Sequence, residues 1–251
     1  MMYKSIRILL LALLLIGTNA CQQQNPPSDA VAENGASVHD EKPDANSDEV
    51  SSSETNASQA SDQTKNILIF GDSITAGYGL EAEQAFPALI QDKIDALDWN
   101  YKIVNGGLSG DTSAGGVRRI SWMLREPVDI LVLELGGNDG LRGTPPEATK
   151  QNLQDIIDEV KSQNEEVVII LAGMQIPPNL GQEYTTKFKN VFPDLAAENN
   201  AMLIPFLLED VGGVPSLNQP DGIHPTAEGH KIVAENVWKI LKPLLAAQIN
   251  A

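Results

Sequence analysis

The stretch Asn66–Ser73, which reads NILIFGDS, joins a run of apolar side chains directly to a glycine, an aspartate and a serine. A short apolar run that is bounded by glycine is typical of a strand buried on both faces of a parallel sheet. Four similar runs follow along the chain: Tyr101–Asn105 (YKIVN), Ile130–Leu135 (ILVLEL), Val167–Ala172 (VVIILA) and Ala201–Phe206 (AMLIPF). With Asn66–Phe70 as the first, the sequence predicts five strands.

Longer segments whose apolar residues recur at helical spacing separate these runs. They are Ala85–Leu97, Thr112–Leu124, Pro146–Gln163, Gln182–Asn199 and a last segment from about Thr226 to Leu245. Strands that alternate with helices form a parallel sheet with helices on both faces. We therefore expect an α/β fold, a three-layer α/β/α sandwich with a five-stranded parallel sheet.

Polar residues follow several of the predicted strands closely. Ser73 comes after the first strand, Asn105–Gly110 after the second, Asn138 after the third, and His224 in the loop after the fifth. In open α/β sheets, ligands bind beyond the carboxyl ends of the strands. We therefore expect these residues, which are distant in sequence, to lie along one edge of the sheet.

Ser73 and the stretch Asp221–His224 (DGIH) supply the three groups of an activated serine nucleophile. A serine hydroxyl needs an imidazole to take its proton, and the imidazole needs a carboxylate to orient it. We predict that Ser73 is the nucleophile, His224 the base and Asp221 the orienting acid. His39 lies in a polar stretch, and His230 falls within a helical segment, where we expect an exposed or capping role.

The glycines around Ser73 permit a sharp turn between a strand and a helix. Gly71, Gly77 and Gly79 can adopt conformations that expose the serine. A phosphate-binding glycine loop is the alternative, and the absence of a lysine after these glycines argues against it. We expect Asp72 to be a turn or cap residue.

Residues 1–21 have the composition of an export signal. Lys4 and Arg7 precede the apolar run Ile8–Ile16, and small and polar residues then lead to Cys21. This run is shorter than the ~20 residues with which a helix spans a bilayer. We interpret residues 1–21 as a signal peptide of the lipoprotein type and expect no transmembrane helix in the mature protein.

Cys21 is the only cysteine, which excludes an internal disulfide and a cysteine-based metal site. Its position resembles the acylated cysteine of exported bacterial lipoproteins, although Thr18 and Asn19 depart from the usual lipobox. We expect Cys21 to carry a lipid that attaches the protein to a membrane surface, with ordinary signal cleavage as the alternative. The expected location is the bacterial cell envelope, as a periplasmic or outer-membrane-associated lipoprotein.

The rest of the chain divides into a polar segment and one domain. Residues 22–65 carry nine acidic and two basic residues and almost no large apolar ones, so we expect a disordered acidic linker. A binding role for its acidic run is the alternative. Residues 66–251 are long enough for one domain with a sizeable core. This domain has 25 acidic and 13 basic residues, which argues against nucleic acid as a partner.

Four blocks resemble the SGNH, or GDSL, hydrolase superfamily in order and spacing. They are Gly71–Ile74 followed by Thr75–Gly79, Asn105–Gly110 followed by Asp111–Ser113, Gly136–Gly140, and Asp221–Pro225. Within the superfamily, the chain is similar to the bacterial thioesterase I, lysophospholipase L1 and arylesterase group. The resemblance covers nearly all of the chain from Asn66 to about Leu245.

This resemblance implies a flavodoxin-like SGNH hydrolase fold and a serine esterase that acts on acyl esters or thioesters. The reaction would pass through an acyl-enzyme on Ser73 and would need no metal or organic cofactor. The donors for the developing oxyanion would be the N–H groups of Ser73 and Gly110 and the side-chain amide of Asn138. The alternatives are a plain loop glycine at Gly110 and a simple turn at Gly136–Asn138.

Two segments are candidates for the walls of an acyl-binding groove. Leu141–Pro146 resembles the mobile loop of related thioesterases, and Met174–Leu180 follows the fourth strand. We hypothesise medium-chain acyl esters, including lysophospholipids, as substrates. A carbohydrate O-deacetylase is the first alternative. The second is a non-catalytic lipoprotein that binds acylated ligands on a retained hydrolase fold.

Overall fold

The computed structural model describes residues 64–250. The expectations for the signal peptide, for Cys21 and for nearly all of the linker fall outside these residues. Within residues 64–250, no helix combines the length and the apolar character that crossing a membrane requires.

Five parallel strands form one sheet, as the sequence predicts. They are β1 (Lys65–Gly71), β2 (Tyr101–Gly107), β3 (Ile130–Glu134), β4 (Val168–Ala172) and β5 (Met202–Ile204). Their order in the sheet is β2-β1-β3-β4-β5, with every neighbouring pair parallel. All five residues of β3 are buried, which explains why its sequence is apolar at almost every position.

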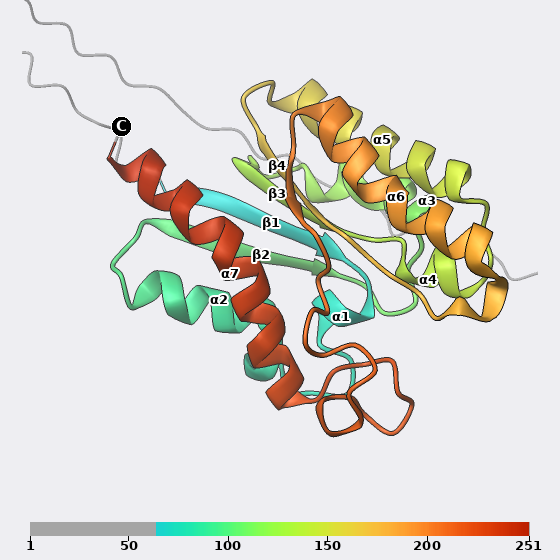
Figure 1. The fold of residues 1–251 in the computed structure, drawn as a ribbon. Helices are drawn as coiled ribbons and strands as arrows, with labels where there is room; N and C mark the ends of the chain where they lie inside the picture. Colours follow the sequence, from blue (N-terminus) through green and yellow to red (C-terminus); the bar gives the residue numbers. More distant parts are fainter. Residues whose placement is uncertain (1–63, 251) are drawn as a thin grey trace, which may run out of the picture. The chain divides into compact units, whose positions relative to one another are not determined.

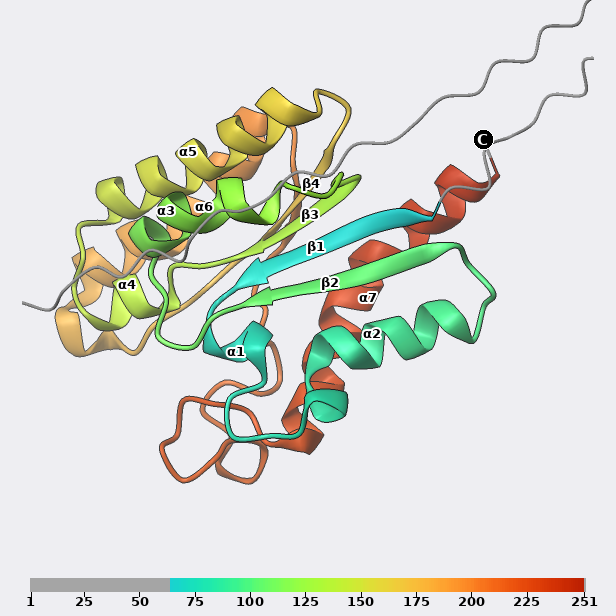
Figure 2. The ribbon, with the colours of Figure 1, turned by 180° about the vertical axis from the view of Figure 1, so that it is seen from behind.

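Helices cover both faces of the sheet (Figures 1 and 2). On one face, α2 (Phe86–Asp95) packs against α7 (Ala227–Ile249). On the other face lie α3 (Ser113–Met123), α5 (Pro146–Gln163) and α6 (Gln182–Asn199). The predicted α/β/α sandwich is therefore confirmed.

Most elements differ from the prediction by a few residues at their ends, and only α5 and α6 match it at both ends; two of the differences have a clear physical reason. β5 stops at Ile204, two residues before the predicted end, and the next residue is Pro205, which has no N–H for a sheet hydrogen bond. The last helix continues beyond the predicted Leu245 as far as Ile249, and Leu245 itself is fully buried.

Two short helices, α1 (Ser73–Ala76) and α4 (Gly137–Leu141), were not predicted. They begin directly after β1 and β3, which are neighbours in the sheet although β2 comes between them in sequence. The strand order therefore reverses between β1 and β3. This is the position at which open α/β sheets form their ligand-binding crevice, and both helices flank it.

His230, for which an exposed or capping role was predicted, lies inside α7 and is buried, not exposed. Its side chain is 1 % exposed and stacks on the ring of Phe86. Its Nδ1 accepts a hydrogen bond of 3.1 Å from the N–H of Phe86, the first residue of α2, so it does cap a helix, although a neighbouring one. Burial lowers the pKa of His230 to about 4, which keeps the ring neutral and able to accept this bond at neutral pH.

Candidate active site

Ser73, His224 and Asp221 form a continuous chain of hydrogen bonds. Ser73 is the first residue of α1, and the other two lie in the loop before α7. His224 Nε2 lies 2.9 Å from Ser73 Oγ, and His224 Nδ1 lies 2.7 Å from Asp221 Oδ2. Because an ionised carboxylate only accepts, Nδ1 donates to Asp221 and Nε2 is left to accept the serine proton.

The backbone around His224 reinforces this orientation. Asp221 Oδ1 accepts the N–H groups of Ile223 and His224 at 2.9 and 3.1 Å, which folds the loop around the carboxylate. The hydrogen bond from the imidazole, followed by these two N–H groups, lowers the pKa of Asp221 to about 2. Asp221 therefore stays ionised at neutral pH.

The turn that carries Ser73 is tightly packed. Asp72 caps α1, because its side chain accepts the N–H of Ile74 at 3.0 Å, as expected for a cap residue. A Cβ atom at Gly71 would clash with the side chains of Thr75 and Glu134, so no larger residue fits there. Gly77 ends α1 in the left-handed conformation, with φ of +72°.

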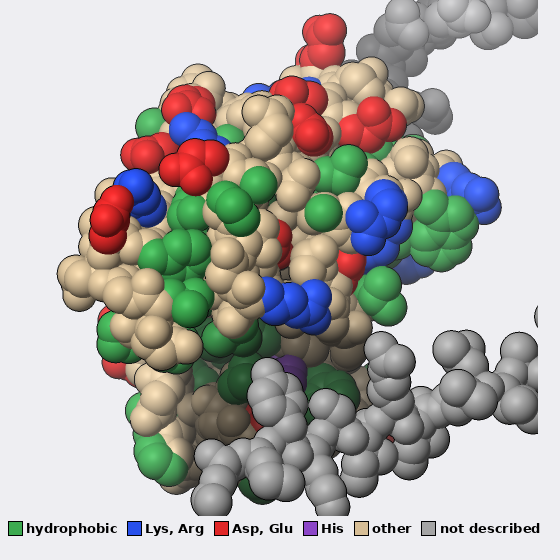
Figure 3. Space-filling model, turned by 90° about the vertical axis from the view of Figure 1, so that its right-hand side faces the viewer, with side chains coloured by type: hydrophobic (Ala, Val, Ile, Leu, Met, Phe, Trp, Pro, Cys, Tyr) green, Lys and Arg blue, Asp and Glu red, His purple; other side chains and the backbone are tan. Residues whose placement is uncertain are grey.

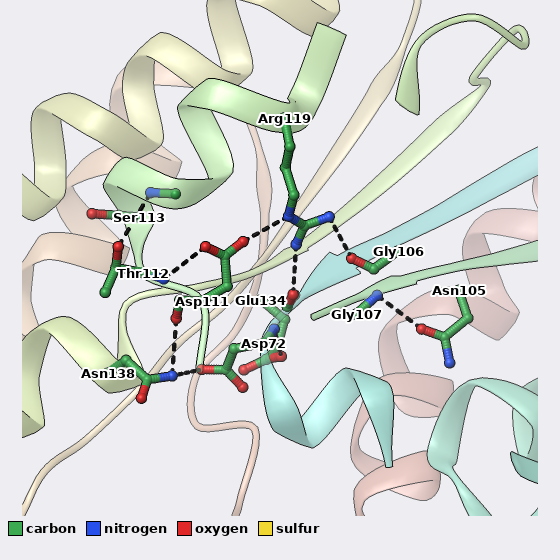
Figure 4. A network of polar contacts seen from close by, with 12 residues as sticks. Asp72, Asn105, Gly106, Gly107, Asp111, Thr112, Ser113, Arg119, Glu134 and Asn138 are labelled. Atoms are coloured by element: carbon green, nitrogen blue, oxygen red, sulfur yellow. Dashed lines mark hydrogen bonds and ion pairs between the residues drawn. The ribbon is translucent and has the colours of Figure 1, made fainter. Parts of the chain in front are cut away.

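Asn138 lies at the start of α4 and lines the same cavity as Ser73. Its Nδ2 donates to Asp72 Oδ2 at 3.1 Å and to the carbonyl of Asp111 at 2.9 Å (Figure 4). Both amide hydrogens therefore have acceptors in this structure. A substrate oxygen has to displace one of these acceptors before Asn138 can donate to it, and Asp72 is the one that lines the cavity.

Gly110 occupies the loop after β2, with φ of +80° and open space where a side chain would be. Its carbonyl accepts a hydrogen bond of 3.2 Å from Arg142 Nη2. Among the described residues, those that line the cavity include Ser73 and Asn138 but not Gly110. The structure thus brings two of the three expected oxyanion donors to the cavity, with Gly110 one residue from the Asp111 carbonyl that Asn138 contacts.

A cavity of about 330 Å³ opens beside Ser73 and His224. Its apolar lining comes from Ile74, Leu141, Met174, Ile176, Pro177, Phe206, Leu208 and Ile223. The space-filling view shows hydrophobic side chains gathered in a hollow, with a histidine among them (Figure 3). The cavity therefore has Ser73 and His224 on one side and a largely apolar lining elsewhere.

Three segments supply most of the apolar lining of the cavity, and two of them were predicted. From Met174–Leu180, the first four residues line it, and from Leu141–Pro146 only Leu141 does. The third wall comes from Phe206–Gly213, in the connection between β5 and α7. Sequence analysis missed this wall because the segment has no helical or strand periodicity.

Sequence analysis also missed Glu134. It ends β3 and is fully buried next to the turn that carries Ser73, where its Oε2 accepts the hydroxyl of Thr75 at 2.6 Å and the N–H of Asp72 at 3.1 Å. Its Oε1 has no hydrogen-bond partner among the described residues. Burial, and then the nearby carboxyl of Asp72, raise its pKa well above the usual range. A glutamate within an apolar run was the signal available in the sequence.

The described residues contain no group of three His, Cys, Asp or Glu side chains arranged to hold a metal ion. The expectation that no cofactor is needed stays a prediction.

Comparison with known proteins gives consistent matches. A family profile described as "GDSL-like Lipase/Acylhydrolase family" matches residues 69–232. The chain is 44% identical to esterase TesA of Pseudomonas aeruginosa over 188 residues, which is 74% of this chain and 92% of that protein. It is 42% identical to thioesterase 1/protease 1/lysophospholipase L1 of Escherichia coli strain K12 over 183 residues, 71% of this chain and 84% of that protein.

A solved structure agrees with these matches. The crystal structure of the psychrotrophic esterase EstA from Pseudoalteromonas sp., inhibited by monoethylphosphonate, superposes with a TM-score of 0.69 at 32% identity. The superposition covers 72% of this chain and 99% of the esterase.

Proposed function

Because the chain belongs to the GDSL-like lipase/acylhydrolase family, and is a serine hydrolase of carboxylic ester or thioester bonds, we propose that Ser73 is its nucleophile. His224 is the general base and Asp221 the acid that orients it. The observation that carries this proposal is the chain of contacts from Ser73 Oγ through both ring nitrogens of His224 to Asp221, at 2.9 and 2.7 Å. It ends at the cavity in which a substrate can lie.

The reaction then proceeds in two halves. Ser73 Oγ attacks the acyl carbon while its proton moves to Nε2 of His224, and the imidazolium is stabilised by Asp221. His224 returns the proton to the departing oxygen or sulfur, which leaves an acyl group on Ser73. Water, activated by the same imidazole, releases the acid and restores the serine.

Three donors stabilise the negative oxygen of each tetrahedral intermediate: the N–H groups of Ser73 and Gly110 and the side-chain amide of Asn138. The position of Asn138 at the cavity supports its role. The amide hydrogen that is bonded to Asp72 has to move to the substrate oxygen, while the other can stay bonded to the Asp111 carbonyl. The positive φ of Gly110 and the open space beside it support a close approach of substrate to its N–H.

The acyl group of the substrate occupies the apolar cavity. Its lining of leucine, isoleucine, methionine and phenylalanine supports medium-chain acyl esters, including lysophospholipids, rather than the acetyl groups of sugars. A carbohydrate O-deacetylase remains the second candidate, because the reactive groups serve either substrate equally.

A series of p-nitrophenyl esters tests this assignment. We expect kcat/KM to rise from acetyl to octanoyl, by roughly fourfold or less for each added methylene, because burying one is worth about 0.8 kcal/mol. Leu141→Ser, at the cavity wall, should lower kcat/KM for octanoyl and leave acetyl unchanged.

The matched control is Leu97→Ser, which changes a leucine of similar exposure, 41% against 42%, that does not line the cavity. It should leave the whole series unchanged. Activity on the acetyl ester alone would contradict the medium-chain proposal and favour the O-deacetylase.

We also propose that the protein is exported to the cell envelope and attached to a membrane by a lipid on Cys21, with residues 22–65 as the linker. The sequence of residues 1–21 supports this proposal. Protein made with its own signal should partition into detergent, whereas the Cys21→Ser variant should stay in the aqueous phase. A wild-type protein found wholly in the aqueous phase would rule out the lipid.

A further inference from the structure

Arg119 connects the ends of β1 and β2 to Asp111, in the loop that follows β2, although it does not line the cavity. It lies on α3, and each nitrogen of its guanidinium donates one hydrogen bond (Figure 4). Nη2 donates to the carbonyl of Gly71 at 2.8 Å, Nη1 to the carbonyl of Gly106 at 2.8 Å, and Nε to Asp111 Oδ2 at 2.6 Å. The three acceptors come from the end of β1, the end of β2 and the loop after β2.

Two of these acceptors, Gly71 and Asp111, are close in sequence or space to groups of the proposed mechanism. Gly71 precedes Ser73 by two residues, and Asp111 directly follows Gly110. The carbonyl of Asp111 accepts the side-chain amide of Asn138 at 2.9 Å. The guanidinium of Arg119 therefore connects the turn that carries Ser73 to Gly110 and, through the Asp111 carbonyl, to Asn138.

The surroundings of Arg119 hold this arrangement rigidly. The side chains of Arg119 and Asp111 are only 19% and 7% exposed, and the guanidinium lies over the ring of Phe70, 3.9 Å from its centroid. Asp111 Oδ1 also accepts the N–H of Thr112 at 3.0 Å, so the carboxylate is bound on both oxygens. Such a partly buried, charge-assisted pair is far more ordered than an ion pair on the surface.

We propose that Arg119 is a positioning residue that acts through Asp111 to hold Gly110 and Asn138 in register with Ser73. The proposal rests on the function proposed above. The planar fork of the guanidinium matters, because a lysine ammonium has a different geometry and cannot donate to three acceptors in one plane. A small displacement of catalytic groups lowers rates steeply, by about 10² for 1 Å.

The effect of losing Arg119 should fall on kcat. The oxyanion carries its charge only in the transition state, so misplaced donors weaken that state more than the bound ester. We expect Arg119→Ala to lower kcat by roughly 10- to 50-fold with KM changed by less than about threefold. Arg119→Lys should recover only part of the loss. The control is Arg118→Ala, the exposed neighbour on the same helix, which should leave kcat unchanged.

Chemical rescue separates positioning from simple loss of stability. Guanidinium ion at tens of millimolar should restore part of the kcat of Arg119→Ala, because the ion can occupy the space between the three acceptors. The same concentration of sodium chloride should not, and neither wild type nor Arg118→Ala should gain from guanidinium. A variant whose kcat falls but is not restored, with an unfolding midpoint lowered to the assay temperature, would show a structural role only and overturn the proposal.

The variant Asp111→Asn keeps the test informative if Arg119→Ala fails to fold. It preserves the side-chain size and removes the charge that Arg119 binds. Because Arg119 and Asp111 share one ion pair, the losses of kcat in the single variants Arg119→Lys and Asp111→Asn should not multiply in the double variant. Losses that multiply fully, or an Arg119→Ala protein with wild-type kcat, would overturn the proposal.

Failure of the underlying function has a different signature. An active Ser73→Ala protein would remove the serine mechanism itself, whatever Arg119 does. An inactive Ser73→Ala protein beside a fully active Arg119→Ala protein would leave that mechanism standing and remove only the positioning role.

Discussion

Ser73→Ala is expected to lower kcat by about 10⁴-fold or more while the domain stays folded. The loss follows from removal of the only atom that forms the acyl bond, and hydrolases of this type retain little beyond what their oxyanion donors supply. The fold should tolerate the change, because within residues 64–250 the hydroxyl of Ser73 makes a single hydrogen bond, to His224. Rates on a p-nitrophenyl ester measure the loss of kcat. Thermal unfolding of the same preparations shows whether the domain stays folded.

A fluorophosphonate probe checks that the loss is chemical. Wild type should carry the label on the peptide that contains Ser73, and Ser73→Ala should carry none. Ser121→Ala, at an exposed position of α3, is the matched control and should be labelled and active like wild type. Full turnover by Ser73→Ala would exclude the mechanism.

The sequence was sufficient to predict the sheet and the long helices. Strands that are buried on both faces have to be apolar at nearly every position, and β3 and β4 are clear examples. The helices α5 and α6 begin and end at the predicted residues because each has a long apolar face. By contrast, α1 and α4 have four and five residues, too few for any periodicity to show.

The residues of the triad could be predicted because parallel strands bring their carboxyl ends to one edge. Their contacts in the structure agree with that prediction, whereas their roles stay proposals until variants are measured. The network behind them could not be predicted, since it depends on which side chains of α3 and β3 meet the loops. Arg119 stood beside Arg118 with nothing in the sequence to separate them, and only the packing of α3 decides which one turns inward.

The pKa values of the carboxyl groups near Ser73 are shifted in opposite directions. Asp221 has a lowered pKa and stays charged, which suits a partner for an imidazolium. Burial raises the pKa of Asp72 to about 6 and that of Glu134 well above its usual range. Both shifts favour the protonated form of these carboxyl groups next to the turn that carries Ser73, although a pKa of about 6 leaves Asp72 mostly ionised at neutral pH.

Asn138→Ala is expected to lower kcat by about 10²- to 10³-fold, with KM little changed. One preorganised donor to an oxyanion is worth roughly 3 kcal/mol in related chemistry, and its contribution appears only once the carbonyl oxygen becomes charged. Steady-state kinetics on the octanoyl ester measure both constants. The matched control is Asn190→Ala, an exposed asparagine on α6, which should leave both constants unchanged.

Asn138 also bonds to Asp72 and Asp111, so a purely structural role has to be separated from donation to the oxyanion. A phosphonate inhibitor that mimics the tetrahedral intermediate makes the distinction. If Asn138 donates to the oxyanion, its loss should slow phosphonylation of Ser73 by about the factor by which kcat/KM falls, because both reactions develop the same charge. An Asn138→Ala protein with kcat within twofold of wild type would mean that the amide stays with Asp72 and Asp111 throughout turnover. The Ser73 and Gly110 N–H groups would then be the only donors.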